Sequence, residues 1–316
     1  MKRYDKRFIL ALCGLIVILF LLPLFLPRFY VYILAVIYVT SLLAMSLNIL
    51  VGFGGLFQFH HAVFYGVSAY TVALLIVKTS ISPWLAFVAG PIAAMIVGVL
   101  IGWFCVRLIR LYFGMLQISL GSLIWAIAFR WYSLTHGDDG IHGIDVPELI
   151  SPLRHSYYFI LLVFLVSLFF IYKILNSPFG VTLQAIRDNP ERCEAIGINV
   201  RRHQLYAIVI ATLFAGIAGV LFVVLERSVF PDLLFWVFSL EIFIMCLLGG
   251  WFTFAGPIIG AAIMVSLRTF VGIYTEYWTL ILGIILIILI FYLPEGVMGF
   301  FQHLFKKEEN VVKERT

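Results

Sequence analysis

Long apolar runs follow one another along nearly the whole chain, separated by short polar or glycine-containing segments. About 20 apolar helical residues cross a hydrocarbon core about 30 Å thick, and these runs reach that length. Residues 281–290 show none of the alternation of apolar and polar residues that a transmembrane β-barrel requires. We therefore expect an all-α polytopic membrane protein with about ten transmembrane helices. The predicted spans are residues 8–26, 30–49, 61–77, 84–104, 112–134, 157–175, 205–225, 235–250, 257–274 and 277–293.

A polar segment, residues 176–204, separates two of these spans. The residue before a proline disfavours α-helix, so the preceding span is expected to end at Ser177. A first short helix fits residues 181–186. Asp188 or Asn189 can then cap a second short helix, because their side-chain oxygens accept hydrogen bonds from the first free backbone N–H groups.

The second short helix carries start and stop signals at both ends. Pro190 suits its first position, and Glu191 and Glu194 favour its first turns. Gly197 suits a left-handed residue at its C-terminal end. We expect a helix near residues 189–197 that lies across one face of the membrane and can bind a soluble partner. The alternative is an ordinary solvated loop whose arginines mark the cytoplasmic side.

Composition and charge place this segment on one side of the membrane. Only 12% of residues are charged and 63% are hydrophobic, whereas about 25% of a soluble domain is charged. The net charge of +5 does not indicate nucleic-acid binding, because basic residues of a membrane protein mark its cytoplasmic face. With ten spans, both termini and the basic clusters fall on one side, which is predicted to be cytoplasmic. These basic residues are Lys2, Arg3, Lys6, Arg7, Arg107, Arg110, Lys173, Arg187, Arg192, Arg201, Arg202, Lys306 and Lys307.

Two glycine-rich junctions interrupt the predicted helices, at residues 48–61 and 249–260. Irregular backbone at membrane depth must be shielded by protein or line a wet cavity, and broken helices often line transport pathways. The alternative is a tight turn whose small residues allow close helix packing. Candidate pathway residues in the first junction and in the span at 112–134 are Asn48, Gly52, Gly55, Gln58, His61 and Gln117.

Few ionisable residues fall inside the predicted spans. Glu241, Arg268 and Arg130 do, and an intramembrane charge is a functional candidate. The two arginines lie near the outer ends of their spans, where their long side chains can reach the interface. Glu241 lies deeper, so we add it to the candidate pathway residues. Its alternative role is that of a buried partner for Arg268 or for a backbone amide.

The motifs that would indicate catalysis or metal binding are absent from the sequence. His60 and His61 are adjacent and would point about 100° apart on a helix, which does not suit chelation of one metal. Residues 137–148 lack the EF-hand spacing, and the cysteines lack CxxC spacing. The chain also lacks a P-loop for ATP, an H-E-x-x-H motif and a G-x-S-x-G motif. We expect no catalytic residues, no metal site and no cofactor bound by this chain.

Several segments resemble the permease subunit of branched-chain amino acid ABC importers, the LivM-type family. Residues 177–207 are similar to its cytoplasmic loop, including the E-A-x-G coupling motif at Glu194, Ala195 and Gly197. The chain departs from the family at residues 58–61, where relatives usually have smaller residues before a single histidine, so His60 is extra bulk. The other similar segments, in the same order, are residues 47–75, 112–144, 247–261 and 293–300.

The resemblance implies an ABC importer permease fold in a bacterial inner membrane. Residues 1–305 would form a single permease domain with the polar segment as its coupling loop, followed by a cytoplasmic tail at 306–316. A second homologous permease would complete a heterodimer, and two ATPase subunits would bind ATP and Mg. The residues implied in coupling to the ATPase are Arg187, Asn189, Glu191, Glu194, Ala195 and Gly197.

The resemblance also implies an extracytoplasmic substrate-binding protein. Acidic residues of the outer loops would pair with its basic residues, or they are ordinary solvated residues. These are Asp138, Asp139, Glu226 and Asp232. The expected substrates are branched-chain or related amino acids, with urea, short amides and aromatic acids as alternatives within the class. An ion-coupled secondary transporter is a different alternative, although it would be expected to carry more intramembrane acids than Glu241.

Overall fold

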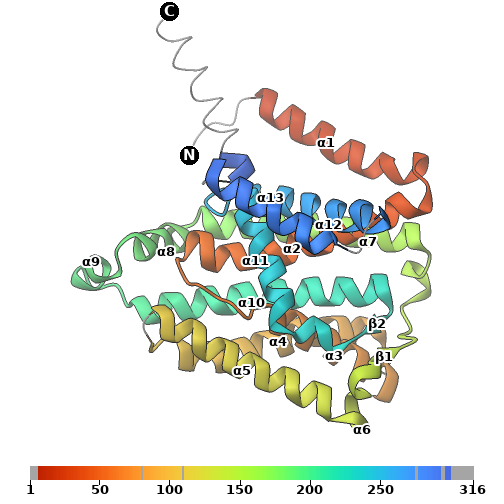
Figure 1. The fold of residues 1–316 in the computed structure, drawn as a ribbon, viewed down its shortest axis with the longest axis horizontal. Helices are drawn as coiled ribbons and strands as arrows, with labels where there is room; N and C mark the ends of the chain where they lie inside the picture. The colour runs from red at the N-terminus through yellow and green to blue at the C-terminus, as the bar shows by residue number, and fades with distance from the viewer. Residues whose placement is uncertain (1–5, 80, 109, 275–276, 293–295, 300–316) are drawn as a thin grey trace, which may run out of the picture.

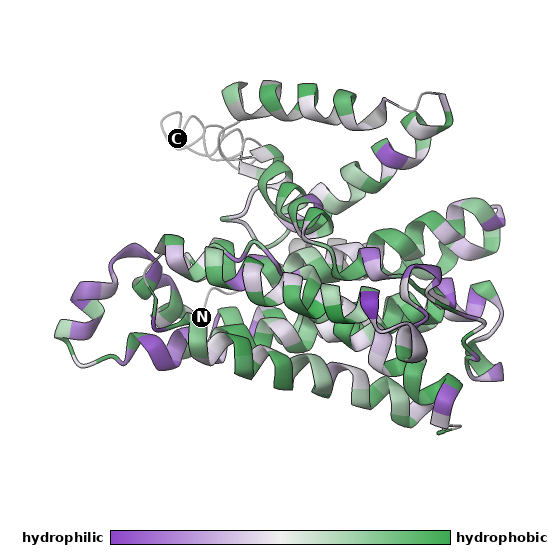
Figure 2. Ribbon diagram, turned by 60° about the horizontal axis from the view of Figure 1, so that its bottom comes forward, coloured by the Kyte–Doolittle hydropathy of each residue, from purple (hydrophilic) through white to green (hydrophobic). Residues whose placement is uncertain are grey.

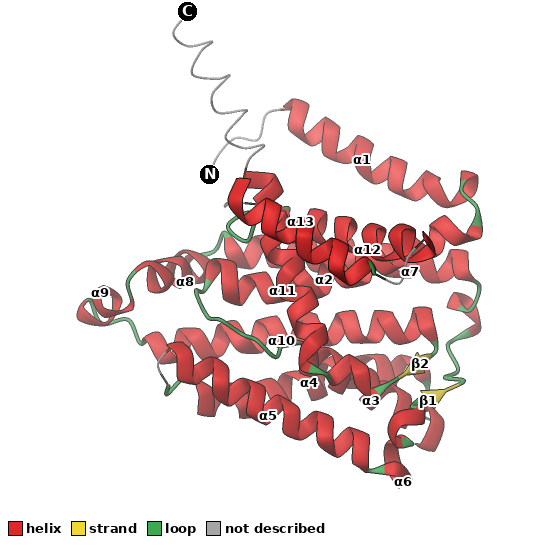
Figure 3. Cartoon of the chain, viewed as in Figure 1, coloured by secondary structure: helices red, strands yellow, loops and turns green. Residues whose placement is uncertain are grey.

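The computed structural model describes residues 6–79, 81–108, 110–274, 277–292 and 296–299. The predicted cytoplasmic tail at 306–316 lies outside these ranges. Helices form most of the described chain, and they lie side by side in one bundle (Figures 1 and 3). The helices from the N-terminus to the outer loop are α1 (Lys6–Phe25), α2 (Arg28–Asn48), the π-helix η1 (Ile49–Phe53), α3 (Ala62–Thr79), α4 (Pro83–Cys105), α5 (Arg110–Arg130), α6 (Tyr132–Thr135) and the 3-10 turns η2 (Gly137–Asp139) and η3 (Glu148–Ile150). The remaining helices are α7 (Leu153–Leu175), α8 (Pro178–Asp188), α9 (Pro190–Ala195), α10 (Val200–Glu226), the 3-10 turn η4 (Pro231–Leu234), α11 (Trp236–Gly249), α12 (Gly256–Tyr274) and α13 (Trp278–Tyr292).

A helix lies over each of the ten predicted spans, which confirms the all-α polytopic class. Within the described residues, seven helices are long and apolar enough to cross a membrane. Helix α11 has 14 residues and α13 has 15. At 1.5 Å per residue each is roughly 21–23 Å long, shorter than a hydrocarbon core of about 30 Å. The count of ten spans and the cytoplasmic placement of both termini therefore stay predictions.

Hydrophilic residues gather at two opposite ends of the bundle (Figure 2). Helices α8 and α9 of the polar segment form one end, at the left of Figure 1, and α6 with two short strands forms the other. The strands β1 (Ile141–His142) and β2 (Ser228–Val229) pair antiparallel, with Ile141 opposite Val229. They are the exception to the helical architecture in the described part. The polar segment and the acidic loops thus lie at opposite ends, as the span count requires.

Helix α10 forms the centre of the bundle and packs against α2, α3 and α4. Its contact faces carry small residues: Gly216 lies against Pro91 of α4, and Gly219 lies against the backbone of Tyr65 in α3. The Ser68 hydroxyl donates a hydrogen bond of 2.7 Å to the Gly216 carbonyl. Lipid supplies no hydrophobic drive between helices, so close approach through small residues and interhelical hydrogen bonds hold them together.

Candidate functional site

The two glycine-rich junctions lie against each other. The Asn48 side-chain amide donates a hydrogen bond of 3.3 Å to the Thr253 carbonyl of the second junction. A Cβ on Gly52 would overlap the Trp251 carbonyl oxygen and the Asn48 side chain. Glycine at position 52 is therefore needed for the close approach of the two backbones. Helix α2 ends in the π-helix η1, and irregular chain then runs from Gly54 to the start of α3.

Four polar residues selected from the sequence are buried around the first junction with unpaired atoms. Asn48, Gln58, His61 and Gln117 are each at most 2% exposed. Among the described residues, nothing bonds to Asn48 Oδ1, to His61 Nδ1 or to either side-chain polar atom of the two glutamines. An unsatisfied buried polar group costs about 1–3 kcal/mol. Such groups are normally satisfied by water or a ligand, so this part of the bundle suits a hydrated path.

The environment of His61 fixes which of its ring nitrogens is free. The Ser46 hydroxyl donates its proton to the Leu43 carbonyl at 2.6 Å. His61 Nε2 lies 2.8 Å from the same hydroxyl oxygen and must therefore be the donor of that contact. In a neutral imidazole the other nitrogen is then an acceptor. The unpaired Nδ1 of His61 thus offers a lone pair to water or to a donor group on a ligand.

The His60 ring contacts two other elements, η4 and α5. Its Nε2 lies 2.8 Å from the Leu234 carbonyl of η4, and its Nδ1 lies 3.3 Å from the Ile118 carbonyl of α5. Helix α5 makes room for the ring, because a Cβ on Gly121 would overlap His60 Nδ1. The extra bulk of His60, where the chain departs from the family, is therefore accommodated by Gly121 on the facing helix. The two positions are far apart in the sequence.

The polar segment folds as its capping signals predict. Asn189 Oδ1 accepts a hydrogen bond of 2.9 Å from the Arg192 backbone N–H, and Pro190 opens α9. Gly197 has φ = +87°, the left-handed conformation expected after the helix. The first short helix, α8, is longer than predicted and begins at Pro178, since proline is also favourable at a helix start.

Helix α9 has a buried underside and an exposed tip. Cys193 packs against Ile186 of α8 and Val200 of α10, which fixes α9 to the bundle. Glu191, Glu194, Ala195, Ile196 and Gly197 are exposed, and the Ile196 side chain is 77% exposed. A large apolar side chain between a carboxylate and a glycine is a natural contact for a partner protein. Sequence analysis missed Ile196, although an isoleucine inside the E-A-x-G motif could have indicated it.

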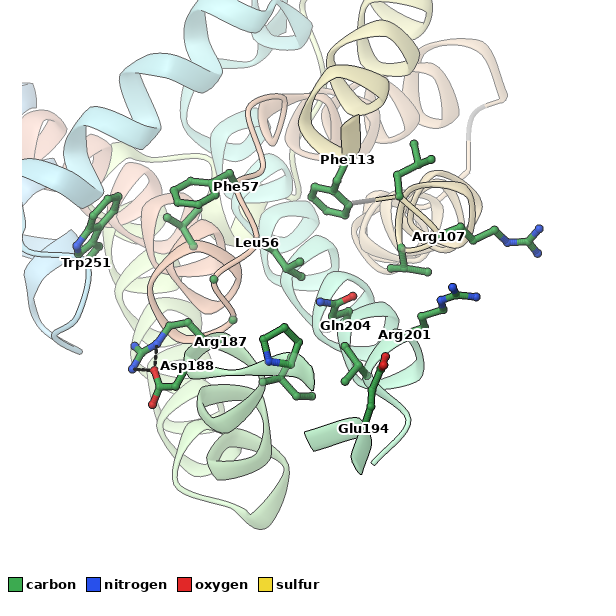
Figure 4. Close-up of a pocket in the computed structure, with 18 of the residues that line it drawn as sticks. Leu56, Phe57, Arg107, Phe113, Arg187, Asp188, Glu194, Arg201, Gln204 and Trp251 are labelled. Carbon is green, nitrogen blue, oxygen red and sulfur yellow. Dashed lines mark hydrogen bonds and ion pairs between the residues drawn. The ribbon is translucent and has the colours of Figure 1, made fainter. Parts of the chain in front are cut away.

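Arg187 links the polar segment to both junctions (Figure 4). Its Nη1 donates a hydrogen bond of 2.7 Å to the Gly52 carbonyl, and its Nη2 forms a 2.9 Å ion pair with Asp188. Its guanidinium carbon lies 5.2 Å from the centre of the Phe252 ring. Its aliphatic stem packs on Gly55, where a Cβ would lie 2.6 Å from Arg187 Cγ. Sequence analysis grouped Arg187 with the ATPase contacts; its guanidinium turns back toward the junctions.

A cavity of about 670 Å³ separates the polar segment from the first junction. Its walls include Phe57 and Trp251 on one side and Glu194 and Arg201 on the other (Figure 4). Arg187 also lines it, between the two sides. The cavity therefore lies beside the contacts that Arg187 makes with Gly52 and Gly55.

The acidic residues of the outer loops fall into two groups. Asp138 and Asp139 are exposed, and Asp139 accepts a hydrogen bond of 2.8 Å from the Tyr132 hydroxyl, which raises the pKa of Tyr132. Glu226 and Asp232 instead line a second cavity of about 810 Å³. Strand pairing between β1 and β2 holds the two outer segments together. Of the four acids, Asp138, Asp139 and Asp232 are exposed, and Glu226 is half-buried.

Glu241 also lines the second cavity, where its Oε2 lies 3.5 Å from Arg268 Nη1. The structure thus confirms Arg268 as the partner of Glu241. The backbone N–H of Ala62, next to His61, donates a hydrogen bond of 2.9 Å to the Ser239 hydroxyl at the outer end of α11. Asn48 instead contacts Thr253 of the second junction. Of the pathway candidates chosen from the sequence, Glu241 is the one that lines this second cavity.

Broken helices, unpaired buried polar groups and an exposed helix at one end define a membrane transport permease. The chain belongs to the family described as the permease component of the branched-chain amino acid transport system, whose profile matches residues 29–290. It is a permease subunit of an ATP-binding cassette importer and a multi-pass protein of the inner membrane. Its relatives are transport subunits that work as components of a larger system.

Curated relatives cover most of the chain. It is 26% identical over 316 residues to the high-affinity branched-chain amino acid permease LivM of Escherichia coli (strain K12), covering 92% of this chain and 74% of LivM. It is 24% identical over 286 residues to LivH of the same strain, covering 82% of this chain and 91% of LivH. A probable LivM from Methanocaldococcus jannaschii is 24% identical over 235 residues, covering 68% of this chain and 67% of that protein. No solved structure matches the chain.

Proposed function

We propose that this chain forms half of the translocation pathway of an importer for branched-chain or related amino acids, driven by ATP hydrolysis on separate subunits. The names of its relatives support the substrate class, since LivM and LivH are both branched-chain amino acid permeases. The observation that carries the mechanism is Arg187, whose side chain joins the polar segment to Gly52 and Phe252. The chain itself has no catalytic role, and ATP and Mg bind to the partner ATPases.

The second permease is a homologue, and the pathway lies between the two chains. Similarity to both LivM and LivH, two permeases of one bacterium, supports a heterodimer of related subunits. Two ATPases bind on the cytoplasmic side, which is the end that carries α8 and α9. An extracytoplasmic binding protein delivers substrate to the end that carries Asp138 and Asp139.

Coupling proceeds through contacts of the polar segment. The ATPase receives the exposed tip of α9, at Glu191, Glu194, Ala195 and Gly197, while Asn189 caps the helix and keeps its shape. Because Cys193 is packed against α8 and α10, a push on α9 moves these elements together. Arg187 then transmits the displacement to the junctions. ATP can drive this change only by binding one arrangement of the complex better than the other.

The pathway residues respond to that change. In the described arrangement Asn48, Gln58, His61 and Gln117 are closed off from solvent. Their unpaired atoms become hydrated, or bind substrate, when the junctions separate. This arrangement therefore corresponds to a closed state of the pathway.

Reconstitution tests the proposal. The chain is assembled in proteoliposomes with its partner permease, ATPases and binding protein, and uptake of labelled leucine is measured with and without Mg-ATP. We expect uptake only with Mg-ATP, and competition by valine and isoleucine. Preferred uptake of urea, short amides or aromatic acids would overturn the substrate class. Uptake by this chain alone under an ion gradient, without ATP, would overturn the ABC mechanism.

A further inference from the structure

The outer cavity of about 810 Å³ lies between the outer halves of α2, α10, α11 and α12. Its volume falls within the roughly 300–1,000 Å³ that is usual for small-molecule sites. Charged residues from different elements line it: Glu226 ends α10, Asp232 lies in η4, Glu241 lies in α11 and Arg268 lies in α12. The fold thus brings acids and a base together at one cavity from positions far apart in the sequence.

Polar contacts tie the helices around this cavity in pairs. The Tyr32 hydroxyl of α2 donates a hydrogen bond to Glu226 of α10. Glu241 Oε2 and Arg268 Nη1 lie 3.5 Å apart, longer than the roughly 2.7–2.9 Å of a tight charge-assisted hydrogen bond. The Glu241 side chain is 22% exposed, whereas that of Arg268 is 60% exposed. The Arg268 side chain is therefore the more accessible partner of this pair.

The apolar wall of the cavity lies one helical turn deeper than the charges. Helix α11 runs inward from its outer end, so Met245 follows Glu241 by one turn. Helix α12 runs outward, so Met264 precedes Arg268 by one turn, and Val36 follows Tyr32 by one turn in α2. Methionine side chains adapt readily to apolar ligands of different shape. The cavity therefore has a charged mouth and an adaptable apolar floor.

We propose that this outer cavity is a binding site for a zwitterionic amino acid with an apolar side chain. The ligand carboxylate pairs with Arg268, and its ammonium group lies among Glu226, Asp232 and Glu241. The ligand side chain reaches the floor at Met245 and Met264. Among the described residues, three acids and one arginine line the cavity, so the surplus of acidic side chains suits an ammonium group. Urea or an uncharged amide would form no ion pair with these acidic and basic side chains. This inference rests on the proposed function and specifies where its substrate first contacts this chain.

Variants of the charge pair test the site in the full reconstituted transporter. Glu241→Gln, Arg268→Gln and the double variant are compared with Glu148→Gln and Arg130→Gln, whose side chains are exposed and do not line the cavity. We expect leucine uptake to fall at least about tenfold in all three cavity variants, with uptake by the two controls within about twofold of wild type. The double variant matters because it removes both charges and leaves neither one unpaired.

A second measurement varies the ligand and needs no variant. The wild-type permease and ATPase complex, without binding protein, is placed in nanodiscs, and binding of labelled leucine is measured by equilibrium dialysis. Leucinamide lacks the carboxylate and 4-methylpentanoate lacks the ammonium group. We expect each analogue to compete at least about tenfold more weakly than leucine. If gel filtration shows that the variants do not assemble, this competition measurement on the wild-type complex tests the binding site by itself.

The outcomes separate this inference from the proposed function. Wild-type leucine uptake by the double variant would overturn the cavity site while the importer function stands. Equal competition by leucine and both analogues would also overturn it. A wild-type complex that hydrolyses ATP but imports no amino acid would overturn the proposed function itself.

Discussion

Arg187 Nη1 donates a hydrogen bond of 2.7 Å to the carbonyl oxygen of Gly52, across 135 positions of sequence. Arg187 lies near the end of α8 and Gly52 lies in the π-helix η1. The bond joins the polar segment, which we propose receives force from the ATPases, to the junction that we propose closes the pathway. The same guanidinium pairs with Asp188, which holds it in place.

Loss of this contact should uncouple transport. We expect Arg187→Lys to lower leucine uptake at least about tenfold while ATP hydrolysis continues. Lysine carries the charge but lacks the planar fork that contacts Asp188, Gly52 and the Phe252 ring together. Uptake and ATPase activity are measured in the same proteoliposomes. The control is Arg202→Lys, an exposed arginine at the start of α10, which should leave both activities unchanged. Coupled uptake at wild-type rate in Arg187→Lys would refute this role.

Gly52→Ala should destabilise the chain. Its Cβ would overlap the Trp251 carbonyl, so the junctions must move apart. Overpacking of this kind costs typically about 1–3 kcal/mol. The effect is a fall in the melting temperature in detergent. This temperature is determined by heating samples and measuring the remaining folded protein by size-exclusion chromatography. The matched control is Gly272→Ala in α12, where a Cβ meets nothing within 4 Å and should be neutral or stabilising. Equal melting temperatures for wild type and Gly52→Ala would contradict the close approach.

Ile196→Asp should weaken ATPase binding without unfolding the permease. The Ile196 side chain is 77% exposed, so its replacement lowers the folding stability of the permease little. A partner protein, in contrast, would have to bury a new charge beside Glu194. We expect co-purification with the ATPases to fall at least about tenfold, with normal membrane insertion. Val181→Asp is the control, because Val181 is 61% exposed on α8, away from the α9 tip. Similar loss in both variants would show that Ile196 has no special contact.

Gln58→Leu and Gln117→Leu should raise stability and lower transport. Each glutamine is buried with both polar atoms unpaired among the described residues, so an apolar side chain of similar size removes a desolvation cost of about 1–3 kcal/mol. The same change removes polar groups that the open pathway would hydrate. Ser68→Ala is the contrast, since its hydroxyl is paired with the Gly216 carbonyl and its loss should destabilise. Melting temperature and uptake rate are measured together. A destabilised Gln58→Leu, or one with normal uptake, would contradict the assignment.

Local signals predicted the local structure well. Asn189, Pro190 and Gly197 act through hydrogen bonds and dihedral angles within a few residues, so α9 could be recognised from its sequence. Long apolar runs likewise predicted where the helices lie. The sequence marked Gln58 and Gln117 as polar residues in apolar surroundings, and the structure buries both of them.

Tertiary contacts could not be predicted in this way. Nothing near Arg187 in the sequence indicates that its partner is Gly52, because the contact depends on how α8 packs against η1. The same holds for Gly121, whose missing side chain accommodates His60 from a different helix. The outer cavity joins Glu226 and Glu241, which the sequence assigned to separate roles. The predicted span at 235–250 was already short, and α11 occupies 14 of its residues.

The π-helix Ile49–Phe53 gives the junction a reserve of chain length. A π turn holds about one residue more than an α turn, because its hydrogen bonds join residues five apart instead of four. A return of this turn to α geometry would release one residue into the irregular chain that follows. That chain would then rotate by about 100° relative to α2. Arg187 binds the Gly52 carbonyl inside this turn. The polar segment therefore holds, through Arg187, the π turn that follows α2, where a return to α geometry would change the helical register.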